Sequence, residues 1–190
     1  MIYFTSDLHL GHNNMLKFRD RPFENVEEMN EQLLKNINDI CTKRDTLFIL
    51  GDISYHQNTK ETEEQLSMLN PQLILIRGNH DKQYKESLFA KVMDYCEIKV
   101  YHRKIVMSHY PFAEWNGSHN GAIHLHGHQH NYEDYNISMR DQGILRYDVG
   151  IDANHGMPVS VYDIFRFFDL DIDVYNNGMK QAVNDLIAKR

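Results

Sequence analysis

Histidine occupies every second position between residues 124 and 130, in the stretch His-Leu-His-Gly-His-Gln-His. In an extended strand alternate side chains point to the same face, so this pattern would place four imidazoles side by side. Such a face could bind a metal ion, but a polar strand face or an expression tag would give the same pattern. The stretch is internal and flanked by Ala122 and Ile123, with Leu125 inside it, which argues against a tag. Metal binding and simple packing both remain open from this stretch alone.

Aspartate, asparagine and histidine recur in short motifs along the rest of the chain. In chain order the set is Asp7-x-His9, Gly51-Asp52, Gly78-Asn79-His80-Asp81, His109 and Gly127-His128-x-His130. Each motif alone is common, because Gly-Asp and Gly-Asn are typical turn sequences. Together they offer carboxylate, amide and imidazole donors without a thiolate, which suits Mn, Fe, Zn and related divalent ions. One ion takes about four to six ligands, and the set exceeds that number, so it favours two ions.

The motifs follow short apolar runs that predict β-strands. These strands are expected at Met1–Ser6, Thr46–Leu50, Leu73–Ile76, Lys104–Ser108 and Ala122–His126. Apolar residues at helical spacing predict helices at Glu24–Ile40 and Thr62–Leu69, between the first three strands. This alternation of strands and helices indicates an α/β fold with parallel neighbours. In such sheets ligands bind at the carboxyl ends of the strands, where every one of these motifs is expected.

The second half of the chain is expected to be richer in strands. Glu97–Tyr101 is predicted to pair with the Lys104–Ser108 strand through His102-Arg103, and Ile144–Gly150 is a further predicted strand. We expect mainly antiparallel pairs here. Helices are predicted at Val161–Phe168 and, as a C-terminal helix, at about 178–189. We see no linker or repeat, so residues 1–190 are expected to form a single domain.

Composition excludes several classes of protein. The 190 residues are 42% hydrophobic and 25% charged, which is typical of a globular chain rather than a disordered one. The formal net charge of −7 argues against a broad basic surface for nucleic acid, although it does not exclude a local one. No apolar run approaches a membrane span and no signal-peptide pattern is present, so we expect a cytoplasmic protein that does not bind membranes. Cys41 and Cys96 are expected to be free thiols. Monomer and homodimer remain open.

The ordered motifs resemble those of the calcineurin-like metallophosphoesterase superfamily, over residues 7–130 directly. The stretches Phe4–His12 and Asp148–Asp152 are similar to those of small bacterial and phage phosphoesterases in that superfamily. The resemblance implies an α/β fold, a four-layer α-β-β-α sandwich with two mixed β-sheets. It also implies the metal ligands: Asp7, His9 and His130 for one ion, Asn79, His109 and His128 for the other, and Asp52 bridging both. His124 and His126 are then expected to pack or to support ligands.

The implied activity is hydrolysis of a phosphodiester or phosphomonoester bond in a small phosphorylated molecule or nucleotide, by a hydroxide bridging two divalent ions. Manganese is the expected metal, with Fe, Zn, Ni and Mg as alternatives, and a phosphodiesterase is favoured. His80 resembles the general acid that protonates the leaving alkoxide, and Asp81 is expected to brace the loop. The protein phosphatases carry a further Asp after Gly-Asp, but here Gly51-Asp52 continues as Ile53-Ser54-Tyr55. A protein phosphatase is therefore disfavoured, and another group, such as a backbone carbonyl, must orient His80.

Several residues lie close in sequence to the predicted ligands and are expected to contact the substrate. These are Asn79, His12, Asn13, His56, Arg77 and the segment Arg19–Phe23, with Tyr110 and Trp115 as walls of the pocket. Two alternatives stay open beside the enzyme. One is a metal-binding interaction module of the same fold without turnover, against which the full set of motif residues argues. The other is a nuclease, against which the acidic composition and the lack of a basic-aromatic stripe argue.

Overall fold

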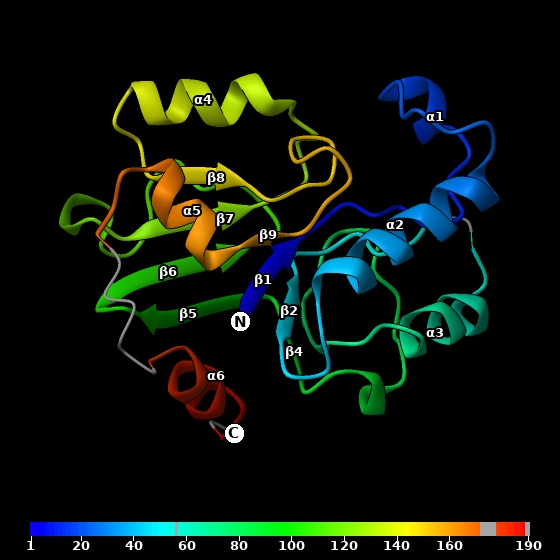
Figure 1. Ribbon diagram of the computed structural model, residues 1–190, viewed down its shortest axis with the longest axis horizontal. Helices are drawn as coiled ribbons and strands as arrows, with labels where there is room; N and C mark the ends of the chain where they lie inside the picture. Colours follow the sequence, from blue (N-terminus) through cyan, green and yellow to red (C-terminus); the bar gives the residue numbers. More distant parts are fainter. Residues whose placement is uncertain (56, 172–177, 189–190) are drawn as a thin grey trace.

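The computed structural model describes residues 1–55, 57–171 and 178–188, arranged as two β-sheets with helices around them (Figure 1). The first half contains β1 (Ile2–Thr5), α1 (Met15–Phe18), α2 (Val26–Ile40), β2 (Thr46–Ile49), α3 (Thr59–Ser67), β3 (Gln72–Ile76), the 3₁₀ helix η1 (Glu86–Leu88) and β4 (Lys91–Met93). The second half contains β5 (Tyr95–Val100), β6 (Arg103–Ser108), the 3₁₀ helix η2 (Ser118–Asn120), β7 (Ile123–His126), α4 (Glu133–Asp141), β8 (Arg146–Asp148), β9 (Val159–Ser160), α5 (Val161–Phe167) and α6 (Gly178–Ala188).

The first sheet has the strand order β4-β3-β2-β1-β9. Strands β1 to β4 run parallel, and β9 is antiparallel to β1. The predicted strand–helix alternation is confirmed, with α2 between β1 and β2 and α3 between β2 and β3. Helix α2 begins two residues later than Glu24, because the Asn25 side chain caps it by accepting from the Glu28 backbone N–H at 2.8 Å.

The second sheet has the order β5-β6-β7-β8 and corrects one prediction. Strands β5 and β6 are antiparallel, as expected, but β6, β7 and β8 are parallel to one another. Parallel neighbours need a crossover, and α4 supplies it between β7 and β8. The sequence did not predict α4, because few of its residues are buried (Asn136 and Met139) and its apolar periodicity is weak. The short strands β4 and β9 were also not predicted.

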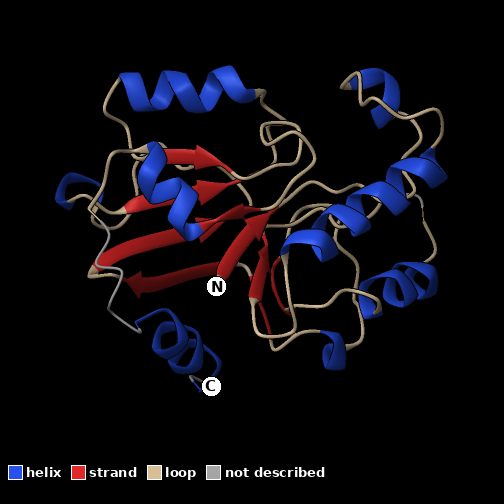
Figure 2. Cartoon of the chain, in the orientation of Figure 1, coloured by secondary structure: helices blue, strands red, loops and turns tan. Residues whose placement is uncertain are grey.

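The two sheets pack against each other, because one apolar cluster contains residues of both. In β2, Phe48 faces the second sheet in one apolar cluster, whereas Leu47 and Ile49 pack with α2 and α3 in another. Helix α4 lies along β8 on the other side of the second sheet (Figure 2). The order helix, sheet, sheet, helix confirms the predicted four-layer sandwich with two mixed sheets.

The predicted C-terminal helix is present as α6, which ends at Ala188 in the described part of the chain; Lys189 lies outside it. Helix α6 packs against β5, and its Val183 and Leu186 join the cluster between the sheets. Across the described ranges, none of the helices combines the length and the apolar composition that a bilayer crossing needs.

Candidate metal centre

The candidate ligands lie at the carboxyl ends of five parallel strands, on two sheets. Asp7, Asp52 and Asn79 follow β1, β2 and β3, and His109 and His128 follow β6 and β7. The fold brings the carboxylates and imidazoles into two groups, Asp7–His9–His130 and Asp52–His109–His128, within each of which one ligand atom per residue lies within 4.8 Å of the others. Residues as far apart as 7 and 130 thus meet at one sheet edge.

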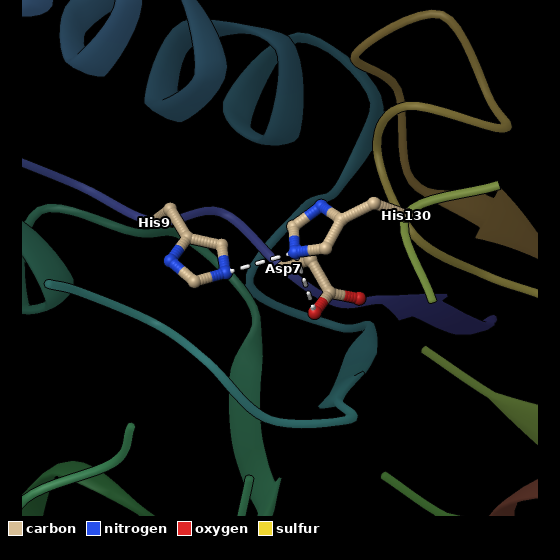
Figure 3. A group of neighbouring side chains, drawn as sticks. All are labelled: Asp7, His9 and His130. Carbon is tan, nitrogen blue, oxygen red and sulfur yellow. Dashed lines mark hydrogen bonds and ion pairs between the residues drawn. The ribbon is translucent and has the colours of Figure 1, made fainter. Parts of the chain in front are cut away.

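The first group is buried on the β1 side of this edge. The Nε2 atoms of His9 and His130 lie 3.1 Å apart, and His130 Nε2 lies 3.7 Å from Asp7 Oδ1 (Figure 3). Asp7 is completely buried, and its Oδ2 accepts from the Ser6 hydroxyl at 2.5 Å and from the His128 backbone N–H at 3.0 Å. The carboxylate is thereby held with its other oxygen toward the two imidazoles.

The second group includes Asn79 by contact. His109 Nε2 lies 3.2 Å from His128 Nδ1, 3.1 Å from Asn79 Oδ1 and 3.5 Å from Asp52 Oδ2. His109 Nδ1 donates to the Leu50 carbonyl at 2.7 Å, so in the neutral ring Nε2 carries a lone pair. His109 Nε2, Asn79 Oδ1 and Asp52 Oδ2 are then three acceptor atoms that converge, an arrangement that a cation stabilises.

One oxygen of Asp52 lies between the two groups. Asp52 Oδ2 is 3.5 Å from His9 Nε2 and also 3.5 Å from His109 Nε2. The other oxygen, Oδ1, accepts from the His80 backbone N–H at 2.9 Å. Asp81 accepts from three backbone N–H groups, those of Gly78, Asp52 and Ile53, which confirms that it braces this loop.

The candidate ligands share an unusual backbone conformation. Five of them adopt left-handed φ angles: Asp7 at 58°, His9 at 51°, Asp52 at 54°, His128 at 70° and His130 at 50°. Each such non-glycine residue costs roughly 1–3 kcal/mol, and this strain is typical of functional sites.

The alternation of the histidine stretch ends at Gly127, so four imidazoles do not share one face. A Cβ on Gly127 would lie 2.1 Å from Ser6 Oγ and 2.3 Å from Asp7 Oδ2. Gly127 is therefore needed for the close approach of this loop to Ser6 and Asp7, which directly follow β1.

Electrostatics favour metal-binding forms of the histidines. Burial, together with the neighbouring His130, lowers the pKa of His9 to about 2, and burial followed by the charge of His109 lowers the pKa of His128. Burial raises the pKa of Asp7 to about 6. Neutral imidazole is the form that ligates metals, so His9 and His128 are held in the form that binds a cation. The carboxylate, imidazole and amide donors together fit divalent ions.

His80 lies at the open side of the cluster beside two aromatic residues. Its side chain is 35% exposed, and its Nε2 is 3.9 Å from Asp52 Oδ2. The ring of Tyr55 lies edge-on to His80 at 4.6 Å between centroids and 4.3 Å from the ring of His12. His12 Nδ1 in turn is 3.4 Å from His9 Nδ1. Tyr55 was missed as a site residue, although its position shortly after Asp52 was an available signal.

Other predicted contacts differ in their placement. Tyr110 lies 4.5 Å from the His128 ring, as a pocket wall would. Asn13 is exposed, and the Arg77 guanidinium pairs with Asp94 through bonds of 2.8 and 2.9 Å. Trp115 packs on His124, away from both groups. His56 lies outside the described residues.

His124 and His126 are packing residues on the outer face of β7. His124 Nε2 accepts from the Phe112 backbone N–H at 3.0 Å, and its Nδ1 lies 3.1 Å from the Val106 carbonyl. His126 contacts the Tyr135 hydroxyl of α4 at 3.1 Å. Neither belongs to a candidate ligand group among the described residues.

Two further residues lie at the site in roles that the sequence did not predict. Asp152 Oδ2 lies 2.7 Å from His130 Nδ1, and Arg21 pairs with Asp152 from the opposite side at 2.9 Å. Burial alone would raise the pKa of Asp152, but hydrogen bonds from His130 and Arg21 outweigh it and lower the pKa to about 2. The stretch Asp148–Asp152 carried a signal for Asp152, and Arg21 lies in the segment Arg19–Phe23 that was expected near the substrate, but no local pattern predicted that the two residues pair.

The fold and these two ligand groups define a class of metal-dependent α/β-sandwich proteins. A family model described as calcineurin-like phosphoesterase matches residues 1–153, and the chain belongs to this family. The family typically binds a two-metal centre, and the chain has two groups of candidate ligands for one.

Relatives of the chain span most of its length. An uncharacterised protein of Methanocaldococcus jannaschii is 33% identical and aligned over 97% of each chain. The gene 66 protein of Mycobacterium phage L5 is 30% identical, over 80% of this chain and 86% of its own length. The crystal structure of a protein of unknown function from Aquifex aeolicus matches with a TM-score of 0.70 and 28% identity, over 87% of this chain and 98% of that one.

Proposed function

We propose that the chain is a metal-dependent phosphoric ester hydrolase that uses two divalent ions, manganese foremost, to cleave a phosphodiester bond in a small phosphorylated molecule or nucleotide. The observation that carries this proposal is the position of Asp52 Oδ2, 3.5 Å from a histidine of each group. A single carboxylate oxygen between two sets of imidazoles is the arrangement expected for two neighbouring ions.

In this proposal Asp7, His9 and His130 hold one ion and Asn79, His109 and His128 the other, with Asp52 shared. Two ions so held supply a water of lowered pKa as nucleophile and offset the charge that develops on the phosphoryl oxygens. The donor set accommodates manganese, as it does iron and zinc, because it combines carboxylate and amide oxygens with imidazoles and contains no thiolate.

His80 is proposed as the general acid. Its Nε2 faces the cluster beside Asp52 and its ring is partly exposed, so it can take up a proton from water and donate it to the departing alkoxide. The Asp52 carboxylate holds the His80 backbone, and the Tyr55 ring makes a T-shaped contact with the imidazole. These contacts support an orientation of His80 that needs no second carboxylate.

The charges around the site support a diester rather than a monoester substrate. Arg21 and Arg77 each bind a carboxylate through two bonds, so their charge is already offset. A monoester dianion benefits more than a diester monoanion from such guanidinium groups. The buried thiols of Cys41 and Cys96, which are not joined by a disulfide, are in keeping with the cytoplasmic location that the sequence predicts. Monomer or homodimer remains a prediction without a test.

The test is hydrolysis of bis-p-nitrophenyl phosphate and p-nitrophenyl phosphate by metal-stripped protein resupplied with Mn²⁺. We expect faster turnover of the diester, a loss of at least about 10²-fold in Asp52→Asn, and little loss in His80→Ala, because p-nitrophenolate needs little protonation. For a substrate with an alkyl leaving group, His80→Ala should lower the rate of turnover by about 10²-fold or more, because the departing alkoxide needs a proton.

Other outcomes would redirect the assignment. If the protein binds two ions but cleaves neither ester with Mn, Fe, Zn, Ni or Mg, it is a metal-binding interaction module rather than an enzyme. Cleavage of single- or double-stranded DNA or RNA in preference to the small diester would identify a nuclease instead.

A further inference from the structure

Arg21 has a buried guanidinium that binds two different parts of the candidate site. It donates to both oxygens of Asp152, from Nε at 2.9 Å and from Nη2 at 3.1 Å. It also donates to the backbone carbonyls of Asp7 and Leu8, each at 2.9 Å. These carbonyls belong to the strained turn between Asp7 and His9, so Arg21 holds the turn that presents both residues.

Asp152 extends this contact to the third member of the first group. Its Oδ2, which accepts from Arg21, also lies 2.7 Å from His130 Nδ1. A carboxylate there requires the proton of the neutral ring to be on Nδ1, so that Nε2 faces Asp7 and His9 with its lone pair. The side chains of Arg21 and Asp152 are each only 4% exposed, so water does not compete for these bonds.

The second group is supported differently. The outer nitrogen of His109 binds the backbone carbonyl of Leu50, and no described side-chain carboxylate contacts it there. The loop of Asp52 is braced by Asp81. The Arg21–Asp152 pair therefore contacts the backbone of Asp7, the carbonyl of Leu8 directly before His9, and the His130 ring, and its described hydrogen bonds reach none of the second group.

We propose that Arg21 and Asp152 are positioning residues for one ion only, the ion held by Asp7, His9 and His130. The pair sets the tautomer of His130 and the position of the Asp7–His9 turn, and it leaves the Asp52–His109–His128 group unaffected. This inference rests on the proposed function in so far as two ions bind, but not on which ester is cleaved.

Calorimetric titration of metal-stripped protein with Mn²⁺ tests the inference without an activity assay. Asp152→Asn keeps the shape of the side chain and one acceptor for Arg21. Its amide N–H would donate to His130 Nδ1 and move the ring proton to Nε2, the nitrogen that must ligate. We expect one of two sites to weaken by about 10- to 100-fold, while the other keeps its wild-type affinity.

Variants in which only one of the two ligand groups is intact identify the affected site. Asp152→Asn should weaken the remaining Mn²⁺ binding by about 10- to 100-fold in His128→Ala protein, which retains the first group, and should change nothing in His9→Ala protein, which retains the second. Equal weakening of both sites, or wild-type affinity at both, would overturn the inference while leaving the proposed function intact. Absence of Mn²⁺ binding to the wild type would instead overturn the proposed function.

The exposed Arg77–Asp94 pair offers a matched control. It has the same two-bond geometry, at 2.8 and 2.9 Å, with the two side chains 47% and 74% exposed. Asp94→Asn should leave both Mn²⁺ affinities unchanged. If Asp152→Asn fails to fold by circular dichroism, Arg21→Lys replaces it, because Lys keeps the charge but cannot bind the carboxylate and the two carbonyls together. The same one-site loss is expected, and its absence counts equally against the inference.

Discussion

The buried side chain of His124 should make the stability of the protein depend on pH in a way that can be isolated. Its Nε2 accepts from the Phe112 backbone N–H, and its ring stacks on Phe112 at 4.9 Å between centroids. Burial, then the nearby His126 and Arg146, lowers its pKa from 6.5 to about 4. Protonation of Nε2 would place its hydrogen against the hydrogen of the Phe112 backbone N–H. The folded state therefore disfavours the protonated ring.

The sign and size of the effect follow from linkage. Between the unfolded pKa of 6.5 and the folded pKa of about 4 the unfolded chain binds more protons, so the free energy of unfolding rises with pH. The stability is fully present above pH 6.5 and is lost as the pH falls toward 4. Between pH 7.5 and pH 4.5 this one histidine should remove about 2.5 kcal/mol.

Urea unfolding of the wild type and His124→Gln at both pH values, in the presence of EDTA, measures this term. Gln can accept from Phe112 and donate to Val106 without titrating, so the stability of the wild type should fall by about 2.5 kcal/mol more than that of the variant. His155→Gln is the control, because the His155 side chain is 75% exposed. Equal losses of stability for wild type and His124→Gln would refute the reasoning.

Three other outcomes are expected. Gly127→Ala places a Cβ 2.1 Å from Ser6 Oγ and 2.3 Å from Asp7 Oδ2. Thermal denaturation should show that the free energy of unfolding falls by about 1–3 kcal/mol, and calorimetric titration should show weaker Mn²⁺ binding at one site. Gly143→Ala, with no atom within 4 Å, should cost stability through its positive φ but leave Mn²⁺ binding unchanged. Asp81→Ala deprives three backbone N–H groups of their acceptor and should cost about 2–5 kcal/mol in urea unfolding, with Asp81→Asn less severe. Adding Mn²⁺ at about 100 times its dissociation constant to EDTA-treated protein should raise the free energy of unfolding by about 2.7 kcal/mol for each site filled. Melting curves measure this change. An unchanged melting temperature would argue against metal binding to the folded state.

The sequence by itself determined the strand ends that carry the candidate ligands. An apolar run that ends in Asp or His is a local pattern, and β1, β2, β3, β6 and β7 all begin and end within about two residues of their predicted bounds. The ordered motifs were also specific enough to indicate the family, which the match over residues 1–153 confirms. The two-group arrangement of Asp, His and Asn residues followed from that resemblance rather than from any one motif.

Only the tertiary structure decided how these residues are supported. The direction of β7 and β8 depends on the crossover through α4, whose polar sequence carries little apolar periodicity. Tyr55 and Asp152 become site residues because loops from different strands meet. Arg21 and Asp152 are 131 residues apart, and a buried Arg–Asp pair has no local signature, since its stability comes from partners that are brought together only on folding. Local patterns predict strand ends; long-range packing selects the partners that orient them.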